Sequence, residues 1–385
     1  MLFIPHKHLY ISGTSYVSAD EPDYKEVITD ANLRRRMGRL LKMAVWCGLK
    51  SLDGVPSERV AGIITSTGAG FMKDTISFGS SIFDREETLL NPSPFMQSTF
   101  NTASGYIALI RKIHAYNTTY VQQADGFAAS LVDAAMLLDD AGEGNVALVG
   151  AFDEVTPEVD VIRQRLGLYR VGDGFLPLGE GAAAFLLSAA MPTDVSDSCP
   201  ATESSTGPGG GDGPESDSEW GGDEAGSEFA SERGDDEAGS ESASDRGGDA
   251  NSECSTGPLH ESESASWPCD ESGSESSSEL LHESGGTSSR SLNGTKDGNA
   301  ALRFCGLANL SDLPKCAANP ISELFGINAG VNLISCADHV ESLGAFRSLL
   351  PVLLCKLISE QKIQDGYTAI VDDVNEDGVI VLLHK

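Results

Sequence analysis

The composition of this chain changes abruptly twice, and the segment between the two changes limits what the chain can fold into. From about Pro192 to Leu302 the sequence is mainly Ser, Gly, Asp and Glu, in degenerate repeats such as "GGDEAGSEFASERGDDEAGSESASDRGGDA". Such a segment buries too little apolar surface to offset the conformational entropy lost on folding, so we expect residues 191–300 to be disordered. The folded core must come from the flanks, residues 1–190 and 301–385.

Most of the negative charge lies in this insert. Residues 194–297 carry 26 Asp and Glu against four Arg and Lys, a net charge of −22 out of −32, which leaves −10 for the rest of the chain. The basic run "LRRRMGRLLK" (33–42) is short and mixed with apolar residues. It favours one basic helix face, or a patch that meets an acidic carrier protein, over a nucleic-acid site.

The eight cysteines show neither a C-x-x-C pair nor a metal-ligand spacing, which is typical of reduced thiols in a cytoplasmic protein. We expect no metal and no cofactor. No stretch reaches the roughly 18 apolar residues of a membrane span, and the N-terminus lacks the pattern of a signal peptide. The sequence therefore predicts a cytoplasmic protein without a membrane span.

Both flanks alternate between strand and helix patterns. We expect strands at "IITST" (63–67) and "NVALVGAFDE" (145–154), and a helix over 344–361 that Pro351 interrupts. A hairpin around Asp377 and Gly378 should end the chain. Because most of the strands are apolar on both faces, the pattern favours an α/β fold of layered sheets covered by helices.

The stretch "TYVQQADGFAAS" (119–130) reads as a strand, a sharp turn at Gly126 and a helix. This geometry holds a nucleophile at a helix N-terminus, where free N–H groups and the helix dipole favour negative charge. Here the turn has Gln122, Gln123 and Asp125 instead of Ser or Cys. An amide is no nucleophile at neutral pH.

Three stretches carry a family resemblance: "QQADGFAASLVDAAMLLDDAGEGNVALVGAFDE" (122–154), "GDGFLPLGEGAAAFLL" (172–187) and "DHVESLGAF" (338–346). On these the chain resembles the β-ketoacyl synthases of the thiolase superfamily. It looks most like shortened synthase-like proteins of aryl-polyene and pigment-type clusters, some of them called chain-length factors. The resemblance implies a thiolase-like α-β-α-β-α fold, with an N-terminal half at 1–190 and a shortened C-terminal half at 301–385.

The resemblance also implies a set of catalytic positions. In the family, an elbow Cys takes up the acyl group, and two His residues stabilise the enolate formed from malonyl carrier protein. Setting Gly126 on the family's elbow Gly places Gln123 at the Cys position. The family's first motif, His-Gly-Thr-Gly-Thr, has no counterpart, and "FGINAGVN" (325–332) lies where it would be. His339 is the one candidate for a catalytic His.

These matches imply a non-condensing, chain-length-factor type of subunit in fatty-acid or polyketide/aryl-polyene biosynthesis. Its partners would be an active ketosynthase, in a heterodimer, and an acyl carrier protein; a homodimer is the other possible assembly. Helix 127–140 and strand 146–152 should lie near the dimer interface, as in the family. Whether the chain itself is an enzyme stays open.

Three alternatives remain at this stage. The chain could be an active 3-oxoacyl-carrier-protein synthase with Cys336 as nucleophile beside His339. It could be a malonyl decarboxylase that uses Gln123 with His339. It could also be a binding scaffold that works through its acidic insert.

Three further features predict structural roles. Glu180 should brace a loop, as the family's Gly-Glu-Gly does. Asp153 and Glu154 look like solvated turn carboxylates. The Gly-rich "STGAGF" (66–71) lacks the Lys-Ser/Thr of a P-loop, so we expect no phosphate site there.

Overall fold

The computed structural model describes residues 2–122, 125–190, 289–291, 301–315, 317–375 and 377–385. All of them belong to one compact unit, made of Met1–Ser198 and Glu283–Lys385. The segment expected to be disordered, 191–300, therefore lies outside the described residues except for Ser289–Ser291. Those three residues form strand β9, which pairs antiparallel with β2 at Gly13–Ser15.

The described strands form one 11-stranded mixed sheet and a separate two-stranded hairpin. The order along the main sheet is β11-β12-β13-β10-β2-β8-β5-β3-β4. Its N-terminal half consists of β2 (Leu9–Val17), β8 (Gly181–Ser188), β5 (Val146–Asp153), β3 (Val60–Thr67) and β4 (Tyr116–Val121). Its C-terminal half consists of β10 (Arg303–Asn309), β13 (Val379–His384), β12 (Tyr367–Val371) and β11 (Val331–Ser335). The short β1 (Leu2–Phe3) pairs with β10.

Within the described residues, the two halves of the sheet are joined by the pairs Arg303 with Tyr10 and Phe304 with Leu9, and by a hydrogen bond from the Ile11 N–H to the Leu302 carbonyl. Each half repeats one pattern. In the first, β3 and β5 are parallel and β8 is antiparallel to β5. In the second, β11 and β12 are parallel and β13 is antiparallel to β12. Since each parallel pair needs a crossover, a helix precedes the middle strand in both halves. These helices are α6 (Gly126–Ala141) and α10 (Leu349–Ser359).

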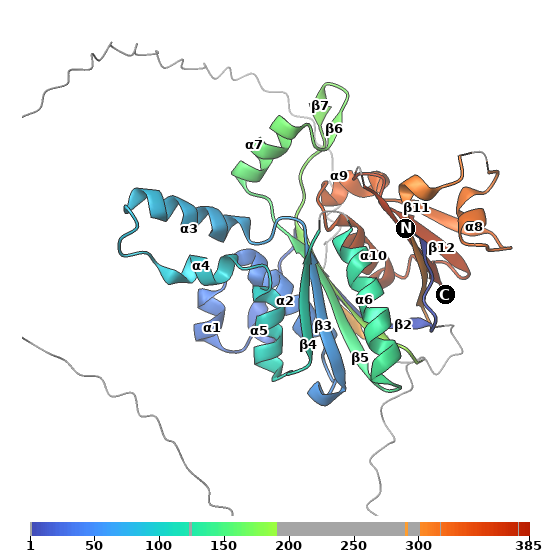
Figure 1. Cartoon of the computed structure of the whole chain (residues 1–385), viewed down its shortest axis with the longest axis horizontal. Helices are drawn as coiled ribbons and strands as arrows, with labels where there is room; N and C mark the ends of the chain where they lie inside the picture. The colour runs from blue at the N-terminus through green and yellow to red at the C-terminus, as the bar shows by residue number, and fades with distance from the viewer. Residues whose placement is uncertain (1, 123–124, 191–288, 292–300, 316, 376) are drawn as a thin grey trace, which may run out of the picture. The chain divides into compact units, whose positions relative to one another are not determined.

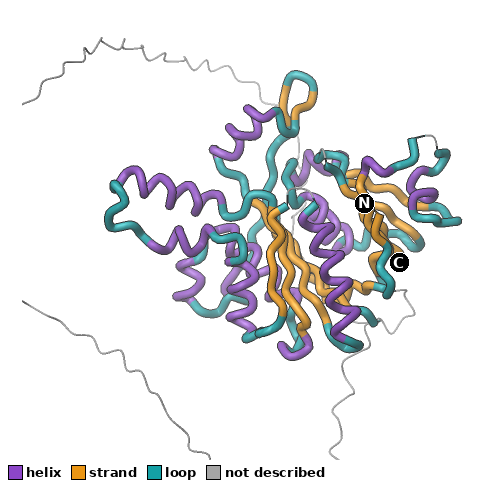
Figure 2. The backbone as a smooth tube through the Cα atoms, viewed as in Figure 1, coloured by secondary structure: helices purple, strands orange, loops and turns teal. Residues whose placement is uncertain are grey.

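Helices cover the sheet (Figures 1 and 2), and three apolar clusters lie between these layers. On one face of the N-terminal half lie α2 (Arg39–Ser51) and α5 (Thr102–Arg111), whose apolar side chains share a core with β3, β5 and β8. The central core combines α6 and α10 with strands of both halves. A small third core lies on the outer face of the C-terminal half, where α8 (Pro320–Leu324) contributes two partly buried side chains. The predicted α-β-α-β-α layering is confirmed.

The expectation that Pro351 interrupts a helix over 344–361 is wrong, and the position of α10 shows why. The helix begins at Leu349, so Pro351 lies in its first turn instead of interrupting it. The backbone N–H groups of a first turn have no acceptor inside the helix, so a proline there removes no helical hydrogen bond. Nine of the eleven residues of α10 are buried, which makes it the most completely enclosed apolar helix of the central layer.

The remaining helices lie around this core. The basic run 33–42 does not form a single helix face, because Met37 is extended and Gly38 caps a new helix. It is divided between α1 (Ala31–Arg36) and α2. The others are α3 (Met72–Asp84), α4 (Pro92–Ser98), α7 (Pro157–Leu166) and α9 (Val340–Leu343); the hairpin of β6 (Arg170–Val171) and β7 (Gly174–Phe175) follows α7. None of the helices in the described part of the chain is long and apolar enough to cross a membrane.

Candidate functional site

The expected strand-turn-helix is present at the elbow. Strand β4 ends at Val121, and α6 begins at Gly126, whose N–H donates to the carbonyl of Gln122 at 3.0 Å. Gln122 and Asp125 are exposed, whereas Gln123 lies outside the described residues.

Glycine suits the start of α6, because the helix packs closely on β3 and leaves little room for a side chain. A Cβ on Gly126 would come within 3.2 Å of the Cβ of Ser66. Ser66 itself donates to the carbonyl of Gly150 at 3.3 Å, which ties β3 to β5 beneath the elbow. The start of α6 is therefore held close to the carboxyl ends of these strands.

Asp153, at the end of β5, is not the solvated turn carboxylate expected from the sequence. Its exposed fraction is 4%. It accepts hydrogen bonds from the Thr67 hydroxyl (3.1 Å) and from the backbone N–H groups of Gly68 (2.8 Å) and Ala69 (3.2 Å). The Ser348 hydroxyl, directly before α10, donates a fourth. Burial raises the pKa of Asp153, and these four donors oppose that rise.

The same contacts explain the Gly-rich loop 66–71. Backbone N–H groups of such a loop can hold a phosphate, but here those of Gly68 and Ala69 point to the Asp153 carboxylate. The N–H of Gly70 donates to the Thr67 hydroxyl at 2.9 Å. The protein's own groups therefore occupy the donors that an anion would need.

A second buried carboxylate, Asp372, directly follows β12 and mirrors Asp153 in the other half. Its exposed fraction is 1%, and burial raises its pKa to about 6. The Asn375 amide donates to it at 2.6 Å. The carbonyl oxygen of that amide accepts from the Tyr169 hydroxyl at 3.0 Å and from Arg347 at 3.4 Å.

Arg347 and Ser348 are adjacent in the sequence and connect the two carboxylates. Ser348 donates to Asp153, and Arg347 donates to Asn375, whose amide donates to Asp372. The Arg347 guanidinium lies 5.9 Å from the centre of the Tyr169 ring. Its side chain also covers Gly68, where an added Cβ would meet the Arg347 Cγ at 2.6 Å. We call Asp153, Ser348, Arg347, Asn375 and Asp372, with Tyr169, the Asp153–Asp372 network. It joins the two halves at the carboxyl ends of their central strands.

Sequence reasoning missed this network. A usable signal was present: both halves contain an apolar strand that ends in an acid pair, "GAFDE" at 150–154 and "AIVDD" at 369–373. The two acid pairs do not show that their carboxylates are buried, because the Asp153 carboxylate is enclosed by Ser348, 195 residues away in the sequence.

Cys336 is completely buried, with an exposed fraction of 0%. Burial raises its pKa well above the ordinary value, and the nearby Asp372 and Asp373 act in the same direction. A thiol in this state is not ionised at neutral pH and is a poor nucleophile.

His339 is half-buried, three residues further along the chain. Burial lowers its pKa, and Lys356 acts in the same direction, so the imidazole is neutral at pH 7. The structure records no hydrogen bond between its ring and Cys336 among the residues it describes.

The other described cysteines are also poor nucleophiles. Cys47 and Cys355 are completely buried and Cys305 is half-buried, and burial raises the pKa of all three thiols. The remaining four, Cys199, Cys254, Cys269 and Cys316, lie outside the described residues.

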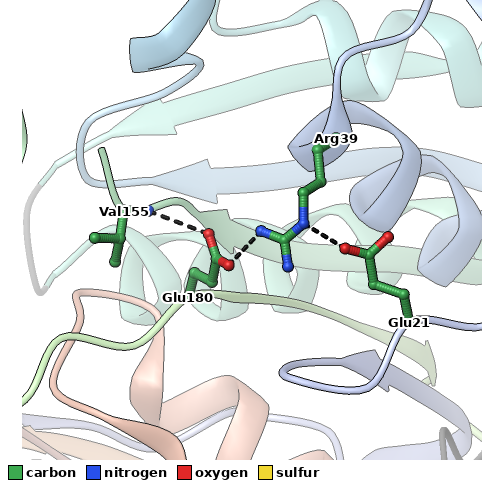
Figure 3. A network of polar contacts seen from close by, with 4 residues as sticks. All are labelled: Glu21, Arg39, Val155 and Glu180. Carbon is green, nitrogen blue, oxygen red and sulfur yellow. Dashed lines mark hydrogen bonds and ion pairs between the residues drawn. The ribbon is translucent and has the colours of Figure 1, made fainter. Parts of the chain in front are cut away.

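Glu180 braces a loop, as predicted (Figure 3). It pairs with Arg39 at the start of α2, and Arg39 also pairs with Glu21. The second Glu180 oxygen accepts from the backbone N–H of Val155 at 3.3 Å, just after β5. Glu180 therefore links α2, the entry to β8 and the segment that follows the Asp153 carboxylate, and it has a structural partner for each oxygen.

The two elements expected near an interface, helix 127–140 and strand 146–152, differ in what they expose. Strand 146–152 is hydrogen-bonded on both edges, to β3 and to β8, and every residue of β5 is buried within this chain. Its proximity to a partner stays a prediction. The free edge of this half of the sheet belongs to β4, which pairs with β3 alone among the described strands.

The arrangement so far defines a layered α/β protein with two similar halves and an elbow at the start of its central helix. Residues 14–166 match the family model of the β-ketoacyl synthase N-terminal domain. This part of the chain is therefore similar to the N-terminal domain of the β-ketoacyl synthases, and the resemblance seen in the sequence is confirmed over these residues. No curated protein sequence matches the chain.

One solved structure supports the fold, and a second, less similar one is a related complex. The ishigamide ketosynthase/chain length factor is 12% identical, with a TM-score of 0.54 over 98% of this chain and 99% of that one. The ketosynthase ApeO in complex with its chain length factor ApeC, from Xenorhabdus doucetiae, is 16% identical, with a TM-score of 0.36 over 47% of this chain and 79% of that one. At such identities the likeness of the first structure establishes the fold alone.

Proposed function

We propose that this protein is a non-condensing, chain-length-factor type of subunit that pairs with an active ketosynthase in polyketide, aryl-polyene or fatty-acid assembly. The observation that carries the proposal is the elbow. The fold presents it at the start of α6, yet the sequence there, Gln122 to Asp125, contains neither Ser nor Cys. The condensation step of this family needs a thiolate at that position, and Gln123 cannot form an acyl thioester.

The Asp153–Asp372 network supports this proposal. It brings two carboxylates, a guanidinium and an amide to the junction of the halves, and each of these groups is hydrogen-bonded to another member or to backbone. Groups satisfied in this way hold a fold together and have little capacity left to bind a carbonyl or an enolate. The network is therefore suited to holding the two halves together and not to binding a substrate.

A partner surface is available beside the elbow. The free edge of β4 exposes Tyr116 (45%) and Val121 (42%), and the neighbouring α6 exposes Met136 (62%). An unpaired strand edge flanked by apolar side chains is suited to adding a strand from a second subunit. That the similar ishigamide structure is named as a ketosynthase/chain length factor is consistent with a two-subunit assembly of this kind.

The alternative of an active enzyme that uses His339 with Cys336 or Gln123 has less support. Its nucleophile would be a completely buried thiol with a raised pKa, or an amide. Among the described residues no hydrogen bond links the His339 ring to that thiol, so this geometry contains nothing that activates it.

Two measurements test the proposal. The purified chain, incubated with radiolabelled acyl carrier protein and malonyl carrier protein, should neither become acylated nor release a condensed product. The same chain, co-expressed with an active ketosynthase from the same genome, should co-purify with it as a heterodimer and be required for product formation.

The Gln123→Cys variant sharpens the test, because we expect no condensation from that change alone. The matched control is Cys336→Ala in the natural chain. Acylation of the isolated protein that disappears in Cys336→Ala would overturn the proposal in favour of an active acyltransferase. A homodimer that shows no interaction with the ketosynthase would overturn the partnership.

A further inference from the structure

A row of side chains crosses the outer face of the sheet where its two halves join. Tyr10 on β2 is paired with Arg303 on β10. Arg303 is also paired with His384 on β13, which is paired in turn with Tyr367 on β12. Side chains of residues paired in this way lie on one face of the sheet, about 5 Å from one to the next. Leu383, the neighbour of His384, packs in the central core, so the row lies on the opposite, outer face.

Arg303 lies at the centre of this row with one of its donors unused. Its Nη1 atom is 3.1 Å from Nε2 and 3.3 Å from Nδ1 of His8, which directly precedes β2. Its Nε atom is buried, and no described residue provides a hydrogen-bond acceptor for it. Because a guanidinium is always charged, an enclosed donor of this kind without an acceptor costs free energy. We call His8, Tyr10, Arg303, His384 and Tyr367 the Arg303 row.

The Arg303 row brings together three groups that can carry positive charge. Burial lowers the pKa of His384, and the nearby Arg303 and His8 act in the same direction. None of the ion pairs recorded among the described residues includes any of the three. An oxyanion bound at this place would accept the unused N–H of Arg303 and offset the repulsion between the three groups.

The Arg303 row can be reached from solvent. His8 is exposed, and an open hollow of about 460 Å³ borders the row, because Tyr367 and Cys305, two residues along from Arg303, are part of its lining. The exposed Asn328 adds a polar amide to the same hollow. A molecule that places an anionic group on Arg303 therefore has room for the rest of its atoms.

A phosphate group suits this cluster better than a carboxylate. A phosphate monoester carries a charge of about −1.5 to −2 at pH 7 and has three terminal oxygens that accept hydrogen bonds. The guanidinium of Arg303 and the rings of His8 and His384 come from three different strands or their flanking segments, so their donors can approach several oxygens at once. A carboxylate has two oxygens and a single charge.

We propose that the Arg303 row binds the phosphate group of a small phosphate monoester. The site shares no residue with the elbow or with the Asp153–Asp372 network. It goes beyond the proposed function, and binding can be measured on the isolated chain whether or not a ketosynthase partner exists.

The first experiment is a calorimetric titration of the full chain with phenyl phosphate at pH 7, in a buffer without phosphate. We expect saturable binding with one site per chain. Benzoate, which has the same ring and a carboxylate, should bind about tenfold more weakly or less, because it offers fewer oxygens and less charge. The neutral benzyl alcohol should not compete.

Two pairs of variants locate the site. His8→Ala should weaken phenyl phosphate binding by about fivefold or more, whereas His6→Ala, at an exposed histidine two residues away, should leave it unchanged. Arg303→Lys keeps the charge but removes the planar fork of donors, and should weaken binding by about tenfold or more. Arg36→Lys, at an exposed arginine of α1, is its control. Because His8 is exposed, the first pair decides the test even where Arg303→Lys does not fold.

A second readout does not depend on any loss of affinity. In an NMR titration of the natural chain, phenyl phosphate should shift the ring signals of His8 and His384 and leave those of His114 and His339 in place. The proposal fails if phenyl phosphate does not bind saturably, if benzoate binds as tightly, if His8→Ala binds as well as the natural chain, or if the His8 and His384 signals do not move.

Discussion

Asp372 should make this protein less stable as the pH rises, which is the reverse of the usual effect of an acidic side chain. Burial raises its pKa from 3.8 to about 6 in the folded protein. Between those values the folded state holds a proton that the unfolded chain has released. The free energy of unfolding must therefore fall as the pH rises through this window. The rise in pKa corresponds to a loss of about 3 kcal/mol once Asp372 is ionised at pH 7.

The substitution Asp372→Asn removes this titration and retains an oxygen that can accept a hydrogen bond from Asn375. Urea unfolding of both proteins from about pH 4 to pH 7 gives the variant's stability minus that of the natural protein at each pH. That difference should become more positive by about 2 kcal/mol across the range, because part of the change already occurs below pH 4, whatever constant offset the changed hydrogen bonds add. Other buried acids such as Asp153 cancel in the difference.

Asp140→Asn, at the exposed end of α6, controls for the loss of one negative charge. A difference curve for Asp372→Asn that is flat, or that slopes the other way, would refute the assignment of a buried carboxylate that is protonated on folding. It would also remove the main electrostatic argument for a tightly enclosed junction between the halves.

Three further substitutions test the contacts around that junction by thermal or urea unfolding. Gly179→Ala should cost about 3 kcal/mol or more, because the new Cβ would lie 1.8 Å from the carbonyl oxygen of Leu343, whereas Gly174→Ala, with its nearest neighbour at 4.0 Å, should be nearly neutral. Ser348→Ala should cost about 1–3 kcal/mol, since it removes one of four donors to a buried carboxylate. Glu180→Gln should cost only about 0.2–1 kcal/mol, and less in high salt, because its arginine partner is 39% exposed.

Each of these has an outcome that contradicts it. A stable Gly179→Ala protein would mean that the segment before β8 does not press against the segment after α9. A loss for Ser348→Ala no larger than that for the exposed Ser342→Ala would mean that the Asp153 carboxylate does not depend on the hydroxyl. A salt-independent loss for Glu180→Gln would contradict an ion pair at that position.

The sequence predicted most of the elements, because each depends on local chemistry. Strand β4, the turn before Gly126 and α6 were all expected from a β-branched run, a glycine and an apolar helical pattern. The hairpin at Asp377 and Gly378 was likewise confirmed between β12 and β13. These features require only neighbouring residues.

Long-range placement was not predictable in the same way. Asp153 looked solvated because two acids after a strand usually are, and only the approach of the 66–71 loop and the start of α10 encloses it. The central position of β5 in the sheet depends on pairing with β3 and β8, which a single pattern of apolar residues does not specify, and whether β5 lies near an interface stays a prediction. Whether Gln123, Cys336 or His339 acts in any reaction stays a prediction.

The pairing of Tyr10 determines how the insert between residues 190 and 301 can be shortened or the chain divided there. Tyr10 is matched with Ser188 on one side and with Arg303 on the other. Since neighbouring strands lie about 4.8 Å apart, the chain leaves the first half and enters the second at points only about 10 Å from each other. A linker of a few residues can span that gap. Residues 1–190 and 301–385 are thus suited to being joined by a short linker, which removes the three-residue β9 from the edge of β2, or to being supplied as two separate polypeptides that reassemble along β2.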